Sequence, residues 1–494
     1  MARGKVHTSR VMLNSFYFPG FGVVLFLAGC GSNGAAAAPA PAGPSMPTAD
    51  AGLDADVPEP MPLHVEWRRS LSCTSAITSF SRGFTLDGEG NVVRVGFLDG
   101  NCTVFEGAPL STDGGASLFA AKLSSADGAR TWGSFYGGGG HDRSLGWSAA
   151  SGLGLSGTVL SGFFGGTLNL GKGPLMAMTT DGTKTDLFVA KLGAAGAVVW
   201  SKSFATDGIF FGAKVAEDAS GAVVLAGSPM SPVDLGGGSI AANLSTLVVA
   251  RLKADGAHDW SKALPGGLAA TASVSGIATD ASGAAVLVGT FSESFDFGGG
   301  ALPNAGATSL FLTKLDVTGT HVFSHGFRCS GAPGSTSCSA RVSVDTDGSS
   351  ALMGEFSGTL DLGDGALLVA PGSSASFVAR FDAGGHLAWR KVLSAERLNV
   401  AFAPSHDLVV AATFVGTLDL EGASFVSKGR RDTAIFALSA AADRTWVQRF
   451  GGEWDDTVDV LAVAPDGSLL LEGGGDIAGL TPPFETEFVA KLRL

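Results

Sequence analysis

The sequence predicts an all-β fold in which seven four-stranded antiparallel sheets form a closed ring. Three observations predict it: two strand patterns that each recur seven times, a composition suited to short strands, and two ends that complement each other. Of 494 residues, 73 are glycine and 45% are hydrophobic, whereas only 16% are charged. We find no sustained helical period after the first 60 residues.

The first pattern is an alternating apolar strand with one Lys or Arg near its end, as in LFVAKL. An aromatic residue follows this position after nine or ten residues in six copies, and Ala437 replaces the cation in the sixth copy. A short Gly-containing turn between the two predicts a β-hairpin. The copies are residues 118–123, 187–192, 247–252, 310–315, 376–381, 434–439 and 487–492.

The second pattern is an apolar strand with a small residue near its end, as in AVLVGTF. Turn sequences such as Asp-Ala-Ser-Gly precede several copies, and a weaker strand precedes each turn. Each unit therefore has four strands, A to D in chain order, and the second pattern is strand B. Its small residues are Gly96, Gly162, Gly227, Gly289, Gly354, Ala412 and Gly473.

The two ends of the repeat region complement each other. Residues 65–71, VEWRRSL, look like a strand D without a preceding strand C, and residues 487–492 are a strand C without a strand D. Pairing the first strand into the last unit closes the ring and removes an exposed sheet edge. We therefore predict a seven-bladed β-propeller over residues 63–494.

Two stretches of the repeat carry a family resemblance. Residues 358–389, GTLDLGDGALLVAPGSSASFVARFDAGGHLAW, and residues 450–473, FGGEWDDTVDVLAVAPDGSLLLEG, resemble the β-propeller repeats of NHL and SBBP type in bacterial surface proteins. The resemblance covers nearly all of residues 65–494 and implies the propeller fold. It implies no particular activity.

The N-terminus has the character of an export signal. Residues 1–10 carry three basic residues, and residues 11–29 are uncharged. The ending Leu-Ala-Gly-Cys30 resembles the bacterial lipobox, which implies that residues 1–30 are a lipoprotein signal and that Cys30 receives the lipid. Gly31 after this cysteine favours the outer membrane by resemblance to Gram-negative sorting. An uncleaved membrane helix is the alternative, and Pro19 argues against it.

Residues 31–62 are rich in Ala, Pro and Gly and cannot bury a core, so we expect a disordered tether. Four further cysteines follow in an exported chain, which favours disulfides over free thiols. Three pairings are possible. Cys329 with Cys338 closes a short loop, which would leave Cys73 with Cys102. No CxxC pair supports a zinc site.

Charge and motifs restrict the function. The formal net charge of −13 disfavours nucleic acid as a partner. The chain has no HExxH or GxSxG motif, and its eight histidines do not cluster. No acid, base and nucleophile converge in the sequence, so we expect a protein that is not an enzyme and has no cofactor or metal. We also expect a monomer.

The connections between strands indicate where a ligand would bind. In each blade the A–B and C–D turns share one face and are short, whereas the B–C and D–A connections share the other face and are longer or more variable. Variable loops on a rigid scaffold usually carry binding. The polar D–A candidates are His141 and Asp142 in one loop, and Trp454, Asp455 and Asp456 in another. Their carboxylates suit a cation or a sugar hydroxyl, or they cap local turns.

The sequence therefore favours a non-catalytic, lipid-anchored propeller of the cell envelope that presents its B–C/D–A face to a protein or glycan. A scaffold subunit of an envelope complex is one alternative. The other is a propeller glycan hydrolase or lyase that uses Asp142, Asp455 and Asp456.

Overall fold

The computed structural model describes residues 63–73, 80–98, 101–104, 110–111, 117–136, 145–150, 157–178, 185–206, 210–243, 245–267, 269–304, 308–330, 338–370, 374–420, 422–475 and 488–493. All of them belong to the unit Pro58–Leu494. The regular elements of the described residues are all β-strands. No helix among these residues is long and apolar enough to span a bilayer. The predicted signal and tether, including Cys30, lie outside the described residues.

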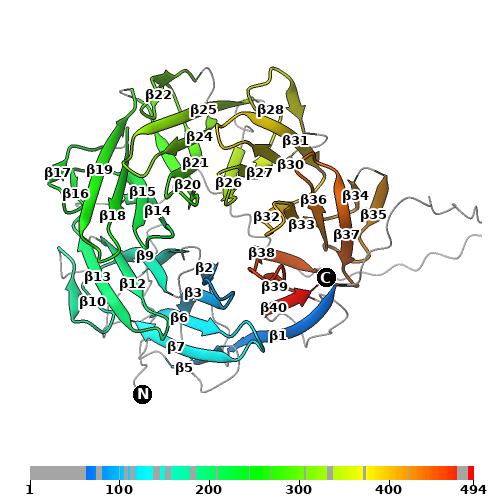
Figure 1. Cartoon of the computed structure of the whole chain (residues 1–494), viewed down its shortest axis with the longest axis horizontal. Coiled ribbons are helices and arrows are strands. Elements are labelled where there is room, and N and C mark those ends of the chain that lie inside the picture. The colour runs from blue at the N-terminus through cyan, green and yellow to red at the C-terminus, as the bar shows by residue number, and fades with distance from the viewer. Residues whose placement is uncertain are drawn as a thin grey trace, which may run out of the picture. The chain divides into compact units, whose positions relative to one another are not determined.

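Seven four-stranded antiparallel sheets form a ring, which confirms the predicted seven-bladed β-propeller (Figure 1). Strand A of each blade is innermost and strand D is outermost. In the order A to D, blade 1 consists of β2 (Phe80–Leu86), β3 (Val92–Leu98), β6 (Ser117–Leu123) and β7 (Arg130–Tyr136), and blade 2 consists of β8 (Leu145–Ala150), β9 (Thr158–Phe164), β12 (Asp186–Leu192) and β13 (Val198–Phe204). Blade 3 consists of β14 (Phe210–Glu217), β15 (Val223–Pro229), β18 (Thr246–Leu252) and β19 (His258–Pro265). Blade 4 consists of β20 (Ala272–Thr279), β21 (Ala285–Phe291), β24 (Ser309–Leu315) and β25 (His321–Ser330).

Blades 5 to 7 complete the ring in the same order. They are β26 (Cys338–Val344), β27 (Ser350–Phe356), β30 (Ala375–Phe381) and β31 (Leu387–Leu393); β32 (Arg397–Phe402), β33 (Leu408–Phe414), β36 (Asp432–Leu438) and β37 (Arg444–Phe450); β38 (Thr457–Val463), β39 (Leu469–Gly474), β40 (Phe488–Arg493) and β1 (His64–Cys73).

The ring closes as the two ends of the repeat region predict. Strand β1 pairs antiparallel with β40, so that His64 lies opposite Arg493 and Ser70 lies opposite Phe488. The first strand thus becomes strand D of blade 7. No C–D turn links β40 to β1, because the two strands come from distant parts of the chain.

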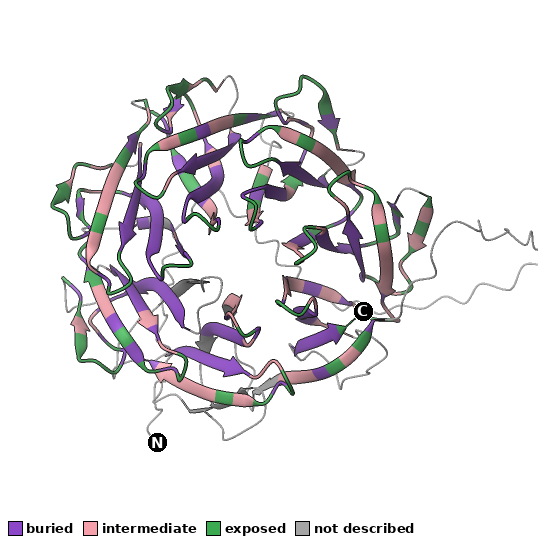
Figure 2. Ribbon diagram, in the orientation of Figure 1, coloured by how far each residue is buried: buried purple, intermediate pink, exposed green. Residues whose placement is uncertain are grey.

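The hydrophobic core lies between the blades. Strands B and C are buried along their length, whereas strand D is mostly half-buried, with few fully buried or exposed positions (Figure 2). One cluster joins Trp200 and Phe204 of blade 2 to Val215 and Leu225 of blade 3. Burying apolar area on both faces of each sheet explains why strands B and C are nearly continuous apolar runs.

Charged residues also lie inside the blade interfaces. The cation of strand C pairs with an acidic residue of the A–B turn, as Arg251 does with Asp218 at 2.5 Å and Lys314 with Asp280 at 2.9 Å. Asp218 also accepts the backbone N–H of Ala222 at 3.1 Å, so it caps its own turn. Removing one partner of such a buried pair leaves an uncompensated charge.

Five tryptophans of strand D pack between blades. The ring lies on the C–D turn of the next blade, and the indole N–H donates to a carbonyl of that turn. The donor–acceptor pairs are Trp67 with Ser125, Trp132 with Ala194, Trp200 with Ala254, Trp260 with Val317, and Trp389 with Ala440, at 2.8–3.1 Å.

The long B–C connections were predicted as variable loops, and the structure corrects this. They contain small hairpins: β4 (Asn101–Val104) with β5 (Leu110–Ser111), β10 (Thr167–Asn169) with β11 (Pro174–Met176), β16 (Val233–Asp234) with β17 (Ser239–Ile240), β22 (Phe295–Asp296) with β23 (Ala301–Leu302), β28 (Thr359–Asp361) with β29 (Leu367–Val369), and β34 (Thr417–Leu420) with β35 (Ala423–Val426).

Two of these hairpins extend the sheet of the preceding blade. Strand β28 pairs with β25, and β4 pairs with β1. Apolar residues before and after the hairpin acid, such as Leu360 and Leu362, enter the core between blades. The acid itself caps the hairpin turn, as when Asp361 accepts the N–H of Gly363 at 2.9 Å. Much of these six B–C connections is therefore structural.

Cys329 and Cys338 form a disulfide, as predicted, with a Cα–Cα distance of 6.4 Å. The bond joins the end of β25 to the start of β26 on the B–C/D–A face. The backbone register places Cys73 opposite Cys102. Their side chains lie outside the described part of the chain, so this second disulfide stays a prediction.

Candidate functional site

The candidate residues of the second D–A loop lie between β37 and β38, on the B–C/D–A face. Trp454 is 63% exposed, whereas Asp456 is fully buried. His141 and Asp142, in the corresponding loop between blades 1 and 2, lie outside the described residues. The structure therefore describes only one of the two predicted loops, the one with residues 454–456.

Asp456 orders its own loop. Its carboxylate accepts the N–H of Gly452 at 2.7 Å, and its carbonyl accepts the hydroxyl of Thr433 at 2.9 Å. The Asp456 N–H donates to the carbonyl of Arg431 at 2.8 Å. A buried carboxylate that accepts a nearby N–H acts as a cap, and this position cannot contact a ligand without rearrangement of the loop.

Asp455 belongs to a network that the sequence did not reveal. The guanidinium of Arg431 contacts Asp455 at 3.2 Å and Glu396 at 2.6 Å. The hydrogen bond that Arg431 donates to Glu396, together with both carboxylate charges, raises the pKa of Arg431 above its usual value. The three side chains are 38–48% exposed. The second carboxylate oxygen of Asp455 is buried and makes no hydrogen bond to any described residue.

These residues come from three separate connections: Glu396 from the D–A connection before β32, Arg431 from the B–C connection before β36, and Asp455 from the D–A connection before β38. No local motif links them, because only the ring brings them together. With exposed Trp454 in the same loop as Asp455, they form a surface with an aromatic ring, two carboxylates and one guanidinium, which we call the Trp454 surface.

Exposed apolar side chains lie mainly on the B–C and D–A connections of the described residues. Of the eleven large exposed apolar side chains in the described residues, eight lie on B–C or D–A connections. These eight are Met176, Met178, Met230, Leu367, Val369, Val415, Val426 and Trp454. The other three, Val199, Val317 and Val322, lie on strand D or a C–D turn.

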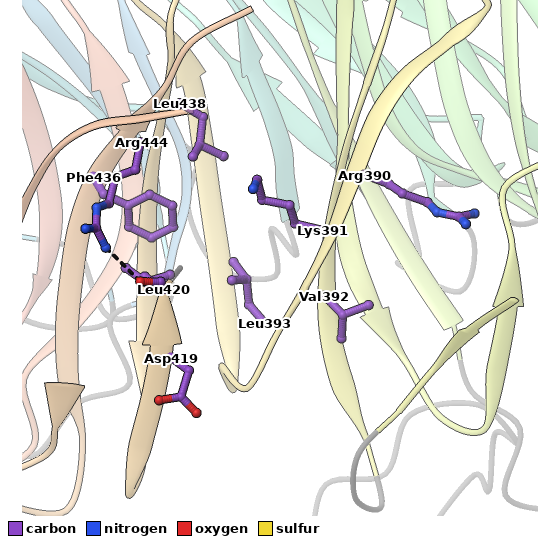
Figure 3. A pocket seen from close by; sticks show the side chains of 9 residues that line it. All are labelled: Arg390, Lys391, Val392, Leu393, Asp419, Leu420, Phe436, Leu438 and Arg444. Atoms are coloured by element: carbon purple, nitrogen blue, oxygen red, sulfur yellow. Dashed lines mark hydrogen bonds between the residues drawn. The ribbon is translucent and has the colours of Figure 1, made fainter. Parts of the chain in front are cut away.

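A cavity of about 210 Å³ lies at the outer side of the interface between blades 5 and 6 (Figure 3). Its walls are β31, the B–C hairpin strand β34 and strand β36, with Lys391, Leu393 and Phe436 among the lining residues. Arg444 donates to the carbonyl of Leu420 at 2.7 Å across one side. Strand β28 pairs with β25 of the preceding blade, but among the described strands β34 does not pair with β31. The cavity lies between β31 and this unpaired hairpin.

The opposite face holds one group of potential metal ligands among the described residues. Atoms of Asp345, Asp347 and His406 lie within 4.8 Å of one another. The buried carboxylate of Asp345 already contacts His406 at 3.0 Å and Arg380 at 3.8 Å. These contacts account for its charge within the protein, and we assign no metal to it.

No description of a known protein family matches the sequence, and no curated protein matches it. Among solved structures, the chain is similar to U3-55K, with 8% identity, a TM-score of 0.42, and 85% of this chain and 98% of that chain covered.

It is also similar to the quinohemoprotein alcohol dehydrogenase of Comamonas testosteroni, with 10% identity, a TM-score of 0.39, and 87% and 76% of the two chains covered. A third similar structure is the α-L-arabinanase of Penicillium chrysogenum complexed with arabinobiose, with 9% identity, a TM-score of 0.38, and 87% and 98% covered. At these values the likeness carries no argument about activity, and the fold assignment rests on the strand pairing above.

Proposed function

We propose that this chain is a non-catalytic binding protein of the cell envelope, anchored by a lipid on Cys30, that holds its ligand on the B–C/D–A face. The observation that carries the proposal is the uneven distribution of exposed apolar side chains, eight of eleven of which lie on connections of that face. Exposed apolar side chains that concentrate on one set of connections mark an interaction surface more often than evenly scattered ones do.

Strand β1, which follows the predicted tether in the chain, begins on the face opposite the proposed ligand site. It begins at His64 beside Arg493, at the end of β40, and therefore on the A–B/C–D face.

The Trp454 surface favours a glycan as the ligand. An exposed indole offers a flat apolar surface on which a sugar ring can stack. The carboxylates of Glu396 and Asp455 accept hydrogen bonds from hydroxyl groups, and Arg431 donates them.

Binding of envelope polysaccharides to the purified protein, measured by calorimetry and on a glycan array, tests this proposal. We expect Trp454→Ala and Glu396→Gln each to weaken binding about tenfold, because each removes a stacking surface or a charged acceptor. Val199→Ser on strand D is the matched control, since it changes an exposed apolar side chain away from the B–C and D–A connections.

Two results would overturn parts of the proposal. If Trp454→Ala and Val199→Ser bind alike, the Trp454 surface does not hold the ligand. If mass spectrometry finds that the bound glycan is cleaved, and Asp455→Asn abolishes the cleavage, the protein is an enzyme. Labelling with a fatty-acid analogue tests the anchor separately: incorporation should require Cys30 and disappear in Cys30→Ala.

A further inference from the structure

The interface between blades 3 and 4 shows how regular neighbours are joined on the A–B/C–D face. Arg251 of strand C pairs with Asp218 of its own blade at 2.5 Å and donates to the carbonyl of Gly283 in the next A–B turn at 3.4 Å. Trp260 of strand D donates its indole N–H to the carbonyl of Val317 in the next C–D turn at 2.9 Å. A cation, a turn carbonyl and an indole donor thus meet at one interface.

The interface between blades 6 and 7 (the 6/7 interface) lacks these contacts. Ala437 stands where strand C carries its cation, and Ala403 stands where the A–B turn carries its acid. Trp446 is the strand D aromatic, and its indole N–H makes no hydrogen bond to any described residue. The C–D turn that accepts this bond elsewhere has no counterpart among the described residues, because β40 and β1 are not consecutive in the chain.

A cavity of about 360 Å³ lies at this interface, which we call the 6/7 cavity. Ala437 and Trp446 line it from blade 6, and Pro465 and Asp466 line it from the A–B turn of blade 7. At a regular interface, the strand C cation and the C–D turn of the next blade lie in this region. The 6/7 cavity is therefore the space that those two groups leave.

The 6/7 cavity carries a carboxylate that has no partner among the described residues. Asp466 is neutralised by Lys491 at 3.2 Å and Arg493 at 2.9 Å. Asp407, which also lines the cavity, makes no side-chain hydrogen bond or ion pair with any described residue. The carbonyl of Gly467 corresponds to that of Gly283, which receives Arg251, and nothing in the described chain donates to it.

We propose that the 6/7 cavity binds a Lys or Arg side chain from a tight turn of a partner protein. The cation would pair with Asp407, reach the carbonyl of Gly467 and lie near the indole of Trp446. A backbone carbonyl of the same turn would accept the Trp446 N–H, as Val317 does for Trp260. The predicted tether, residues 31–62, contains no Lys or Arg and cannot supply this group.

The proposal does not depend on the proposed function, because the 6/7 cavity lies on the A–B/C–D face and the Trp454 surface on the opposite one. The test uses the full purified chain labelled with 5-fluorotryptophan. The Trp446 resonance is assigned by its loss in Trp446→Phe. The probe is acetyl-Gly-Arg-Gly-amide, and the matched control replaces arginine by uncharged citrulline.

The arginine peptide should shift the Trp446 resonance saturably, and the citrulline peptide should bind about tenfold more weakly. Asp407→Asn should weaken binding of the arginine peptide by a similar factor. Ala437→Arg restores the cation of the repeat and should abolish binding while the other tryptophan resonances keep their positions. Asp407→Asn tests the proposal independently if Ala437→Arg fails to fold.

Equal shifts from the two peptides, or full binding by Ala437→Arg, would overturn the proposal. So would a Trp446 resonance that moves with protein concentration and not with peptide, because a second copy of the chain would then occupy the cavity.

Discussion

The interfaces at blades 3/4 and 6/7 use the same strands and differ in what joins them. Arg251 and Asp218 form a buried pair at the first, whereas Ala437 and Ala403 occupy the same repeat positions at the second. Both members of the pair are absent together, so blade 6 holds no unpaired buried charge at these positions. The cation and the acid are therefore present or absent together, and the ring forms with one interface that lacks this ion pair.

The largest expected effect comes from breaking one regular pair. Asp218→Ala leaves the guanidinium of Arg251 buried without its closest carboxylate, and we expect it to lower the free energy of unfolding by about 3–5 kcal/mol. Urea unfolding followed by circular dichroism measures this loss. Asp218→Ala combined with Arg251→Met imitates blade 6 and should lose less than Asp218→Ala alone. Equal losses would contradict the view that the pair is a unit.

A smaller effect separates the tryptophans. Trp200→Phe removes the indole hydrogen bond to Ala254 and should cost about 1 kcal/mol beyond its loss of packing. Trp446→Phe removes no such bond and should cost less. Urea unfolding of the two variants gives the comparison directly, and a greater loss for Trp446→Phe would show that its N–H has a partner.

The next effect concerns backbone strain in blade 6. Ala442 has a φ of 72°, at the turn position where the C–D turn of blade 3 has Gly256 with a φ of 82°. Because a Cβ atom disfavours this region, Ala442→Gly should raise the free energy of unfolding by about 1 kcal/mol. The reverse change, Gly256→Ala, should lower it, since the new Cβ would lie 2.8 Å from Trp200. A stability loss in Ala442→Gly would contradict this account.

The smallest effect is pH-dependent and lies at the interface of blades 4 and 5. Burial between Phe323 and Phe327 lowers the pKa of His325 below its usual 6.5. The unfolded chain therefore binds the proton more readily, and this contribution to stability is present above pH 6.5 and lost as pH falls through the folded pKa. His325→Phe should flatten the stability profile below pH 6.5. An unchanged profile would assign the dependence to other groups.

The repeat made most of the fold predictable. Seven copies of two strand patterns predicted the blades, and the unmatched strands at residues 65–71 and 487–492 predicted the closure. The B–C hairpins were missed because their strands are only two to four residues long, too short for an alternating pattern. Their repeated apolar-Asp-apolar segments, such as residues 360–362, were the signal that could have revealed them.

The candidate site was less predictable than the fold. Asp455 was selected from its own loop, but Glu396 and Arg431 were not, because only the ring brings these three connections together. The 6/7 cavity was also missed. Its signal was present in the sequence as Ala437, the copy of the strand C pattern without a cation, but the missing acid at Ala403 gains meaning only from the paired contacts elsewhere.

Hydrogen exchange of the tryptophan indole N–H groups tests whether the 6/7 interface lacks an acceptor that the regular interfaces have. We expect the indole protons of Trp200 and Trp260, which donate to turn carbonyls, to exchange slowly when followed by NMR. The indole proton of Trp446 should exchange faster, because the 6/7 interface offers it no acceptor among the described residues. Equal protection of all three would contradict the account and show that the 6/7 interface is already filled.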